Sequence, residues 1–450
     1  MEESIVRAAH QTGNTLEVSS GREALELSTM RQVTWRILPY LMICYLVSYI
    51  DRVNIGFAAL QMRSEMDLGN DVFGTGASLF LVTYCIFSVP ANLALQKFGA
   101  RRWIGTMMVV WGAVSIGMVM IDGRWSFYAF RLLLGAAEAG FLPGVIFYIS
   151  RWFPKAYRGQ VSALFLVAIP ASSAIGSPIS ASLLQLHGGL GLSGWQWMFL
   201  LEGLPAVLLG VGFVLFMNNE PEDARWLSRD SRQWLQHSLE AERSQIAELS
   251  GAKKASVWTA LCNPAVIALS LIYAGVISVG ICLSLWQPII IKSYGLTDFQ
   301  TGLINSVPFC IATVAMIWWG RSSDRHNDRT WHTFWPLALS GAALLAAMVF
   351  HSLPAVVVIL TLALIGTYAA KGPFWAMVTQ WCPENISAVG IAVVSAVGSI
   401  AAALSTYLLG EIQKATGSFS LALLPLIALA VVASVVLLIA GLRRRALEKM

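Results

Sequence analysis

The chain has 450 residues, of which 56% are hydrophobic and only 12% are charged. Soluble domains carry about 25% charged residues, so this composition excludes an ordinary soluble protein. Twelve membrane crossings of about 20 apolar residues would use roughly 240 residues and leave about 210 for loops and tails. The composition therefore predicts an all-α polytopic membrane protein. The net charge of +5 requires no nucleic-acid partner, because the basic residues sort by membrane side.

Apolar runs interrupted by charges or by Gly and Pro clusters predict twelve transmembrane helices. They cover residues 34–58, 73–95, 103–121, 126–150, 159–186, 195–217, 264–291, 300–319, 333–350, 355–379, 387–410 and 418–441. A charged stretch divides them six and six, as expected of two tandem halves around a central cavity.

These crossings also define the predicted domain organisation. A tail at 1–33 precedes a six-helix bundle at 34–217, a linker at 218–257, a second six-helix bundle at 258–441 and a basic tail at 442–450. Within the linker, apolar residues recur at helical spacing and predict an amphipathic helix along one membrane face.

The positions of the basic residues predict the orientation of the chain. Most of them fall in segments on the side of the two termini, and the opposite side has only Arg63, Arg124, Lys292 and Lys414. By the positive-inside rule, both termini are expected in the cytoplasm. Three basic residues remain, and these lie within predicted helices: Arg52, Arg131 and Lys371.

The sequence lacks the motifs of enzymes and metal proteins. Its six cysteines have neither CxxC pairing nor metal-like spacing, so we expect them to serve as packing residues. There is no GxSxG element, no phosphate-cradling GxxxxGK[ST] loop and no His/Asp/Cys metal cluster. We therefore expect no enzyme, no metal and no cofactor. Without a nucleotide-binding loop, an ion gradient is the expected energy source.

The loop after the eighth predicted crossing carries a recognisable motif. It reads Gly320-Arg-Ser-Ser-Asp324-Arg325-His-Asn-Asp-Arg329 and resembles the GxxxDRxGRR signature of the major facilitator superfamily. A degenerate copy without the glycine and the acid follows the second crossing, at residues 92–102. The resemblance implies a twelve-helix carrier with a cytoplasmic gate. Its residues would be Lys97, Arg101, Arg102, Gly320, Asp324 and Arg325. The alternative is that these charges only set the topology.

A narrower resemblance covers nearly the whole chain. The first crossing, which contains Asp51-Arg52-Val-Asn54, and the fourth, Arg131-Leu-Leu-Leu-Gly-Ala-Ala-Glu138, resemble those of the anion:cation symporter family. That family includes bacterial carriers for galactonate, glucarate, tartrate and phthalate, and animal carriers for glutamate and sialic acid. Stretches 195–205 and 223–228 resemble the tartrate and phthalate branch. The resemblance implies a monomeric proton symporter in the bacterial cytoplasmic (inner) membrane that imports a small organic anion, best a dicarboxylate.

Four charged residues in the first and fourth crossings are candidates for the transport chemistry. Charged groups in hydrocarbon cost at least ~2.5–3.5 kcal/mol each, so they usually face water and have a function. The resemblance assigns proton coupling to Asp51 and Glu138, and substrate binding to Arg52 and Arg131. Burial favours the protonated form of a carboxyl group, whereas a nearby arginine favours the charged form, and this competition suits a proton carrier. Static ion pairs that fix helix packing are the alternative.

Lys371 is the third embedded base. Thr367, Tyr368 and Trp375 share its helix face by their spacing, so the lysine is expected to lie among aromatic rings. Gly372-Pro373 is expected to loosen this helix. A cation opposite the arginines suits a substrate with two negative ends. The alternative is a lysine that snorkels toward the cytoplasm and is neutralised by Glu384 or a helix C-terminus.

Hydroxyl groups complete the predicted substrate site, which includes Tyr49, Tyr84, Ser395 and Ser399. For the tyrosines, simple packing is an equal alternative. Glu202, near the outer end of the sixth crossing, is assigned to structure. Two further functions stay open: a symporter of galactonate-type or glucarate-type sugar acids, and a proton-driven efflux antiporter. The fifth crossing lacks the glutamine expected of a galactonate site, and three embedded bases favour anion import over efflux.

Overall fold

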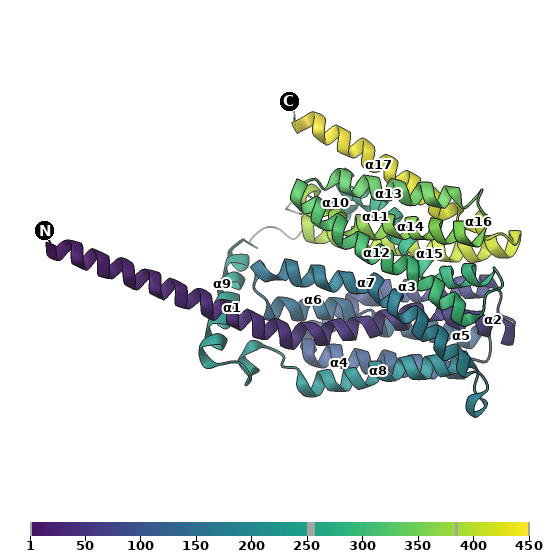
Figure 1. Cartoon of the computed structure of the whole chain (residues 1–450), viewed down its shortest axis with the longest axis horizontal. Coiled ribbons are helices and arrows are strands. Elements are labelled where there is room, and N and C mark those ends of the chain that lie inside the picture. Colours follow the sequence, from purple (N-terminus) through teal and green to yellow (C-terminus); the bar gives the residue numbers. More distant parts are fainter. Residues whose placement is uncertain (1, 250–256, 383–385, 449–450) are drawn as a thin grey trace.

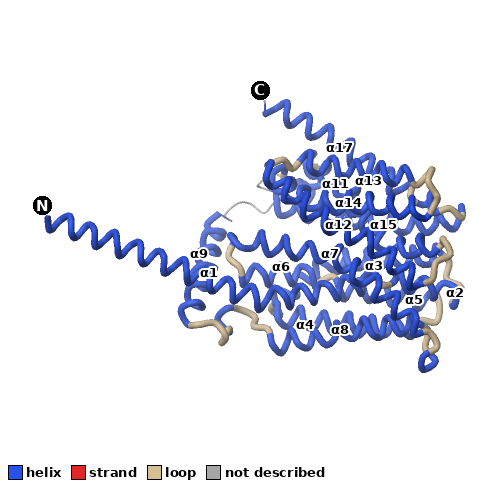
Figure 2. Tube along the Cα trace, viewed as in Figure 1, coloured by secondary structure: helices blue, strands red, loops and turns tan. Residues whose placement is uncertain are grey.

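The computed structural model describes residues 2–249, 257–382 and 386–448, and these residues form helices and loops (Figures 1 and 2). The first half contains α1 (Glu2–Val53), α2 (Ile55–Glu65), α3 (Asn70–Phe98), α4 (Ala100–Gly117), α5 (Arg124–Glu138), α6 (Phe141–Trp152), α7 (Lys155–Leu183) and α8 (Gly194–Phe216). The connection carries α9 (Arg229–Leu249) and α10 (Val257–Leu261). The second half contains α11 (Pro264–Lys292), α12 (Asp298–His326), α13 (Thr330–Ala346), α14 (Leu353–Trp381), α15 (Ser387–Thr416), α16 (Phe419–Ala422) and α17 (Leu424–Glu448).

Local sequence signals define where several of these helices begin. Asn263 caps α11, because its side-chain oxygen accepts from the backbone N–H groups of Ala265 and Val266 at 3.0 and 3.3 Å. Pro264 follows as the first helical residue, where its missing N–H has no cost. The start of α12 has a reciprocal capping box, in which Gln300 and Thr297 bond each other's backbone.

Eleven helical segments are long and apolar enough to cross a membrane. The helix predicted as the ninth crossing is α13, whose 17 residues are at the short end of the spanning range of about 17–25. It packs against α14 and α17 within the second half. The chain is thus a multi-pass, all-helical membrane protein with a twelve-helix arrangement, as predicted.

Two of the crossings contain a short interruption of the helix. The first crossing is interrupted at Asn54, between α1 and α2, and the fourth at Ala139–Gly140, between α5 and α6. The second break has a covalent cause, because Pro143 has no N–H to donate to the carbonyl of Ala139 four residues earlier. Asp51 and Glu138 therefore lie beside helix breaks.

The tenth crossing is continuous where we expected a loosened helix. We expected Gly372-Pro373 to loosen the helix next to Lys371, yet α14 runs without interruption through both residues. Proline inside a transmembrane helix is tolerated when neighbouring helices pack around it, and Pro373 is buried here.

Both ends of the chain lie toward one end of the bundle, together with α9 (Figure 1). We call this end the terminal side, and the opposite end the far side. Helix α1 continues back through the residues predicted as a tail. The helix α9 lies within the linker, where an amphipathic helix was predicted, and buries Leu235 and Leu239.

Polar contacts attach α9 and the linker to the first half. Arg158 of α7 pairs with Glu242 of α9 at 2.6 Å, and Thr29 of α1 donates to Ser231 at 2.8 Å. Trp226 stacks on the fully buried Trp152, with ring centroids 5.8 Å apart.

Candidate functional site

Asp51 is completely buried at the broken end of α1. One carboxylate oxygen, Oδ1, accepts from the Ser115 hydroxyl of α4 and from the Asn54 side-chain amide, the latter at 3.2 Å. The other oxygen, Oδ2, has no hydrogen-bond partner among the described residues. Asp51 thus has neutral donors around one oxygen and a second oxygen that is free to take a proton.

Glu138 is also fully buried, and it forms the central ion pair of the first half. Arg52 donates through both Nε and Nη2 to Glu138 Oε2, at 3.0 and 2.8 Å. The Arg52 side chain is 25% exposed, whereas that of Glu138 is 0% exposed. The guanidinium also lies over the ring of Tyr84, at 4.7 Å. Arg52 therefore contacts a buried acid while part of its own side chain is exposed.

Arg131 differs from Arg52 in that it lies inside the helix bundle. It is 1% exposed, and its guanidinium lies 4.6 Å from the ring centre of Phe80. Its Nε donates to the Gly76 carbonyl at 3.3 Å, and within the described chain its two Nη atoms have no partner. The structure does not bring Arg131 to the surface that Arg52 reaches, so in this conformation only one of the two predicted arginines is accessible to a ligand.

Lys371 lies among aromatic rings, as the spacing on α14 predicted. Its Nζ is 4.2 Å from the ring centre of Tyr368. Tyr368 is fully buried, with Tyr49 of α1 and Ser284 of α11 near its hydroxyl group, so residues of both halves surround it. Glu384, the alternative partner of Lys371, is outside the described residues.

The remaining predicted substrate residues are less closely grouped. Trp375 packs edge-on against Tyr273 of α11 at 5.0 Å. Thr367, which only shares the helix face of Lys371, donates to the backbone carbonyl of Val276. Ser399 donates to the carbonyl of Ser395 on its own helix at 2.9 Å. Among the described residues, no hydrogen bond links these two serines to Arg52 or Lys371.

Polar contacts between the halves cluster on the far side. Lys414 of α15 pairs with Asp71 of α3 at 2.8 Å, and the neighbouring Gln413 accepts from Asn70. Gln61 of α2 donates to Asp298 of α12 at 2.9 Å. These contacts join the two halves on the far side, so the molecule is closed toward that side in this conformation.

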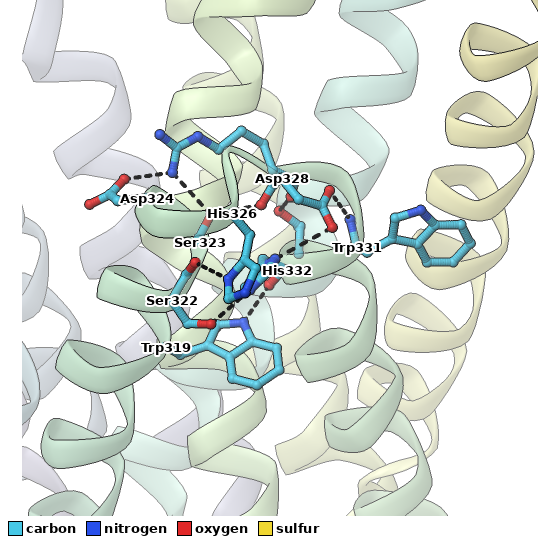
Figure 3. Close-up of polar contacts among 10 residues, drawn as sticks. Trp319, Ser322, Ser323, Asp324, His326, Asp328, Trp331 and His332 are labelled. Atoms are coloured by element: carbon cyan, nitrogen blue, oxygen red, sulfur yellow. Dashed lines mark hydrogen bonds and ion pairs between the residues drawn. The ribbon is translucent and has the colours of Figure 1, made fainter.

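The two signature loops are each bonded within their own half. Figure 3 shows the second loop, where Asp324 pairs with Arg329 at 2.6 Å and Ser322 lies 3.2 Å from His332 Nε2. Arg325 is exposed and Gly320 is half-buried. A methyl group added at Gly320 would meet no atom within 4 Å, so close packing does not require a glycine there.

In the first loop, Arg101 donates to the carbonyl of Val214 at 2.7 Å, whereas Lys97 and Arg102 are exposed. In the part of the chain that the structure describes, the basic residues of this loop form no ion pair with Asp324. The predicted gate residues therefore lie at the terminal side without forming a latch between the halves in this conformation.

The sequence also missed part of the buried network. Glu202 of α8, which we assigned to structure, is 6% exposed and accepts from Ser180 at 2.6 Å and from Asn54 at 2.9 Å. Asn54 thus bonds both Asp51 and Glu202. The signal was present, because Glu202 is an acid within an apolar helix and Asn54 is three residues after Asp51.

Known proteins place this chain in a family of carriers. The family model of the Major Facilitator Superfamily matches residues 41–406 and 275–448. A protein of Agrobacterium vitis, provisionally named a tartrate transporter, is 43% identical over 415 residues, which are 92% of this chain and 95% of the relative. A quinolone resistance transporter of Acinetobacter baumannii is 35% identical over 396 residues, 88% of this chain and 91% of the relative.

The fold comparison agrees with the sequence relatives. A crystal structure of a D-xylose-proton symporter superposes with a TM-score of 0.70 at 14% identity, covering 90% of this chain and 96% of the symporter. At that identity the likeness concerns the fold alone. The chain belongs to the Major Facilitator Superfamily, whose members carry small molecules across membranes and are generally not enzymes.

Proposed function

We propose that the protein is a proton-coupled symporter that imports a small organic anion with two carboxylates, such as phthalate or tartrate, across the bacterial inner membrane. The observation that carries the proposal is the Arg52–Glu138 pair, in which a partly exposed cation is held by a buried acid at 2.8 Å. The name of the Agrobacterium relative supports the substrate class.

The pair offers a direct link between proton and substrate. Both Arg52 donors described above point to one oxygen of Glu138, so a substrate carboxylate competes with Glu138 for the same guanidinium. Protonation of Glu138 removes that competition and frees Arg52 for the substrate. Because the acid is buried, its charge is costly once Arg52 turns to another partner, which favours uptake of the proton.

The second half supplies the other end of the substrate site. Lys371 lies on α14, in the half opposite to Arg52, and its ammonium group rests on the Tyr368 ring. Two cations contributed by two halves suit a molecule with two negative ends, and the flanking rings of Tyr84 and Trp375 suit a planar one.

With the termini in the cytoplasm, the far side is the outer face of the membrane. The Asp71–Lys414 pair and the Gln61–Asp298 bond then close the carrier toward the outside. This arrangement corresponds to an inward-facing state, in which Arg52 is reached from the cytoplasm.

Efflux is the second candidate, because the Acinetobacter relative is named for quinolone resistance. The two functions predict opposite effects of a proton gradient. A symporter accumulates its acid when the outside is more acidic, whereas an antiporter expels its compound under the same gradient. A sugar-acid symporter shares the first behaviour and differs only in the acid that it accepts.

The test uses purified protein in liposomes with an imposed pH gradient. Labelled phthalate, tartrate, galactonate and benzoate are offered separately, and norfloxacin is preloaded for the efflux arm. We expect accumulation of a dicarboxylate that collapses when the gradient is abolished. Glu138→Gln should block this accumulation and leave substrate exchange partly intact. Gradient-driven loss of norfloxacin with no uptake of any acid would refute the proposal.

A further inference from the structure

A third buried acid stands next to the predicted proton-coupling residues. Glu202 lies about 12 Å along α8 from Gly194, at ~1.5 Å per residue, and is 6% exposed. Among the described residues it has no ion-pair partner. A buried carboxylate without a cation is costly, so Glu202 needs either a proton or a compensating change nearby.

The neighbours of Glu202 accommodate a proton. Ser180 Oγ lies 2.6 Å from Oε1, and a hydroxyl can donate to the carboxylate or accept from the protonated acid. Asn54 Nδ2 can only donate, and it occupies Oε2 at 2.9 Å. The proton therefore belongs on Oε1, between Glu202 and Ser180.

The same amide connects Glu202 to Asp51. Asn54 Nδ2 donates to Asp51 Oδ1 at 3.2 Å, so one nitrogen holds both carboxyl groups. The second Asp51 oxygen is unpartnered within the described chain although the residue is fully buried, which leaves a position for a proton. Two carboxylates this close in a low-dielectric interior disfavour double ionisation, so the pair holds one proton and one negative charge.

Glu138 and Arg131 of α5 act electrostatically on the Asp51 end of this pair, whereas around Glu202 the charged groups are sparser. Helix α8 packs against α1, α2, α4 and α7. From α2, Glu65 contacts only the start of α8, where it accepts from Trp195, and from α4, Arg101 contacts the opposite end at Val214. Asp51 of α1 is the charged group that faces Glu202 in the described structure.

We propose that Glu202 is a third proton-exchanging acid, which accepts protons on the outer side of Asp51 and shares one proton with it. In the transfer, the O–H bond at Glu202 breaks and an O–H bond at Asp51 forms, so the pair keeps a net charge of −1. Asn54 holds both carboxyl groups in place throughout. This inference rests on the proposed proton coupling for its role in transport, but not for the protonation of Glu202 itself.

The first experiment uses protons as the probe and needs no substrate. Infrared spectra of the purified protein are titrated with pH, and the carboxylic-acid C=O band is followed in the wild type and in Glu202→Gln. A matched control is Glu220→Gln, which makes the same change in an acid paired with Arg151 at 2.8 Å. Near neutral pH, we expect Glu202→Gln to remove one titrating component of this band and Glu220→Gln, which leaves Glu202 in place, to keep it. An unchanged band in Glu202→Gln would overturn the proposal.

The second experiment measures the pH profile of uptake in liposomes with labelled phthalate and tartrate. Removing the like charge beside Asp51 should move the midpoint of the profile by about one pH unit toward lower pH. Glu202→Asp, which keeps the carboxyl group, should restore most of the wild-type profile. If Glu202→Gln does not fold, Glu202→Asp should shift the infrared component of this acid without removing it, and a component identical to that of the wild type would overturn the proposal. A wild-type profile in Glu202→Gln would exclude a role in coupling. If the wild type takes up neither acid, the proposed function fails, while the infrared result still decides the protonation of Glu202.

Discussion

Gly410 of α15 and Gly74 of α3 allow these two helices to come into direct contact on the far side. A methyl group added at Gly410 would lie 2.5 Å from the carbonyl oxygen of Asn70 and 3.1 Å from the Cα of Gly74. Both neighbours are backbone atoms, which cannot rotate away as a side chain can. We therefore predict that Gly410→Ala destabilises the state closed on the far side and leaves the open state unaffected.

The geometry sets the size of the effect. Overpacking a well-packed contact costs about 1–3 kcal/mol when the backbone has to move. Because the cost falls on one conformation only, it changes the ratio of the two conformations by about 5- to 150-fold. The far-side ion pair does not offset this, since an exposed pair contributes about 0–1 kcal/mol.

Distances between spin labels measure the change. Nitroxides at the exposed positions Ser64 and Thr416 report the separation of the halves on the far side, after the native cysteines have been replaced. Gly410→Ala should convert a short-distance population into a longer one. Gly159→Ala is the matched control, because a methyl group there meets nothing within 4 Å. If the two variants give the same distances, the close helix contact does not control closure.

Three further predictions follow from individual contacts. Lys371→Met should reduce uptake of phthalate more than that of benzoate, and equal losses would exclude a two-ended substrate site. Lys414→Met removes the ion pair with Asp71, but because Lys414 is 61% exposed we expect uptake within about twofold of the wild type; a tenfold loss would show that the pair controls closure. Trp226→Ala removes the stacking on Trp152 and should make the linker more sensitive to limited proteolysis, whereas an unchanged cleavage rate would mean that other contacts hold α9.

The sequence predicted the helices correctly and singled out the charged candidates, both for a simple physical reason. Transmembrane helices require long apolar runs, so their number and approximate limits are present in the composition of each segment. For the same reason, a charged residue inside such a run stands out, as Asp51, Glu138 and Lys371 do. The family pattern added the arrangement of the two halves.

The contacts that these residues make could not be predicted from the sequence, because they depend on how the helices pack. Arg52 and Arg131 look alike in sequence and both lie over the Phe80 ring, yet the side chain of Arg52 is partly exposed and Arg131 is buried. The role proposed for Glu202 depends on its bond with Asn54, which lies 148 residues away in the sequence. Gly372-Pro373 is an example in the opposite direction. These residue types tend to loosen a helix, yet α14 is continuous through both of them because neighbouring helices pack around it.

The described acids of the buried network all belong to the first half, on α1, α5 and α8, while Lys371 belongs to the second. In carriers of this kind the halves move largely as rigid units around the site. Such a motion keeps the Asn54 bonds and the Arg52–Glu138 pair intact and changes mainly the distance between Arg52 and Lys371. In the proposed mechanism, protonation is then controlled within one half, and a substrate that bridges both halves responds to their movement. Arg52 takes part in both events, so the proposal requires the coupling between proton and substrate to pass through its guanidinium group.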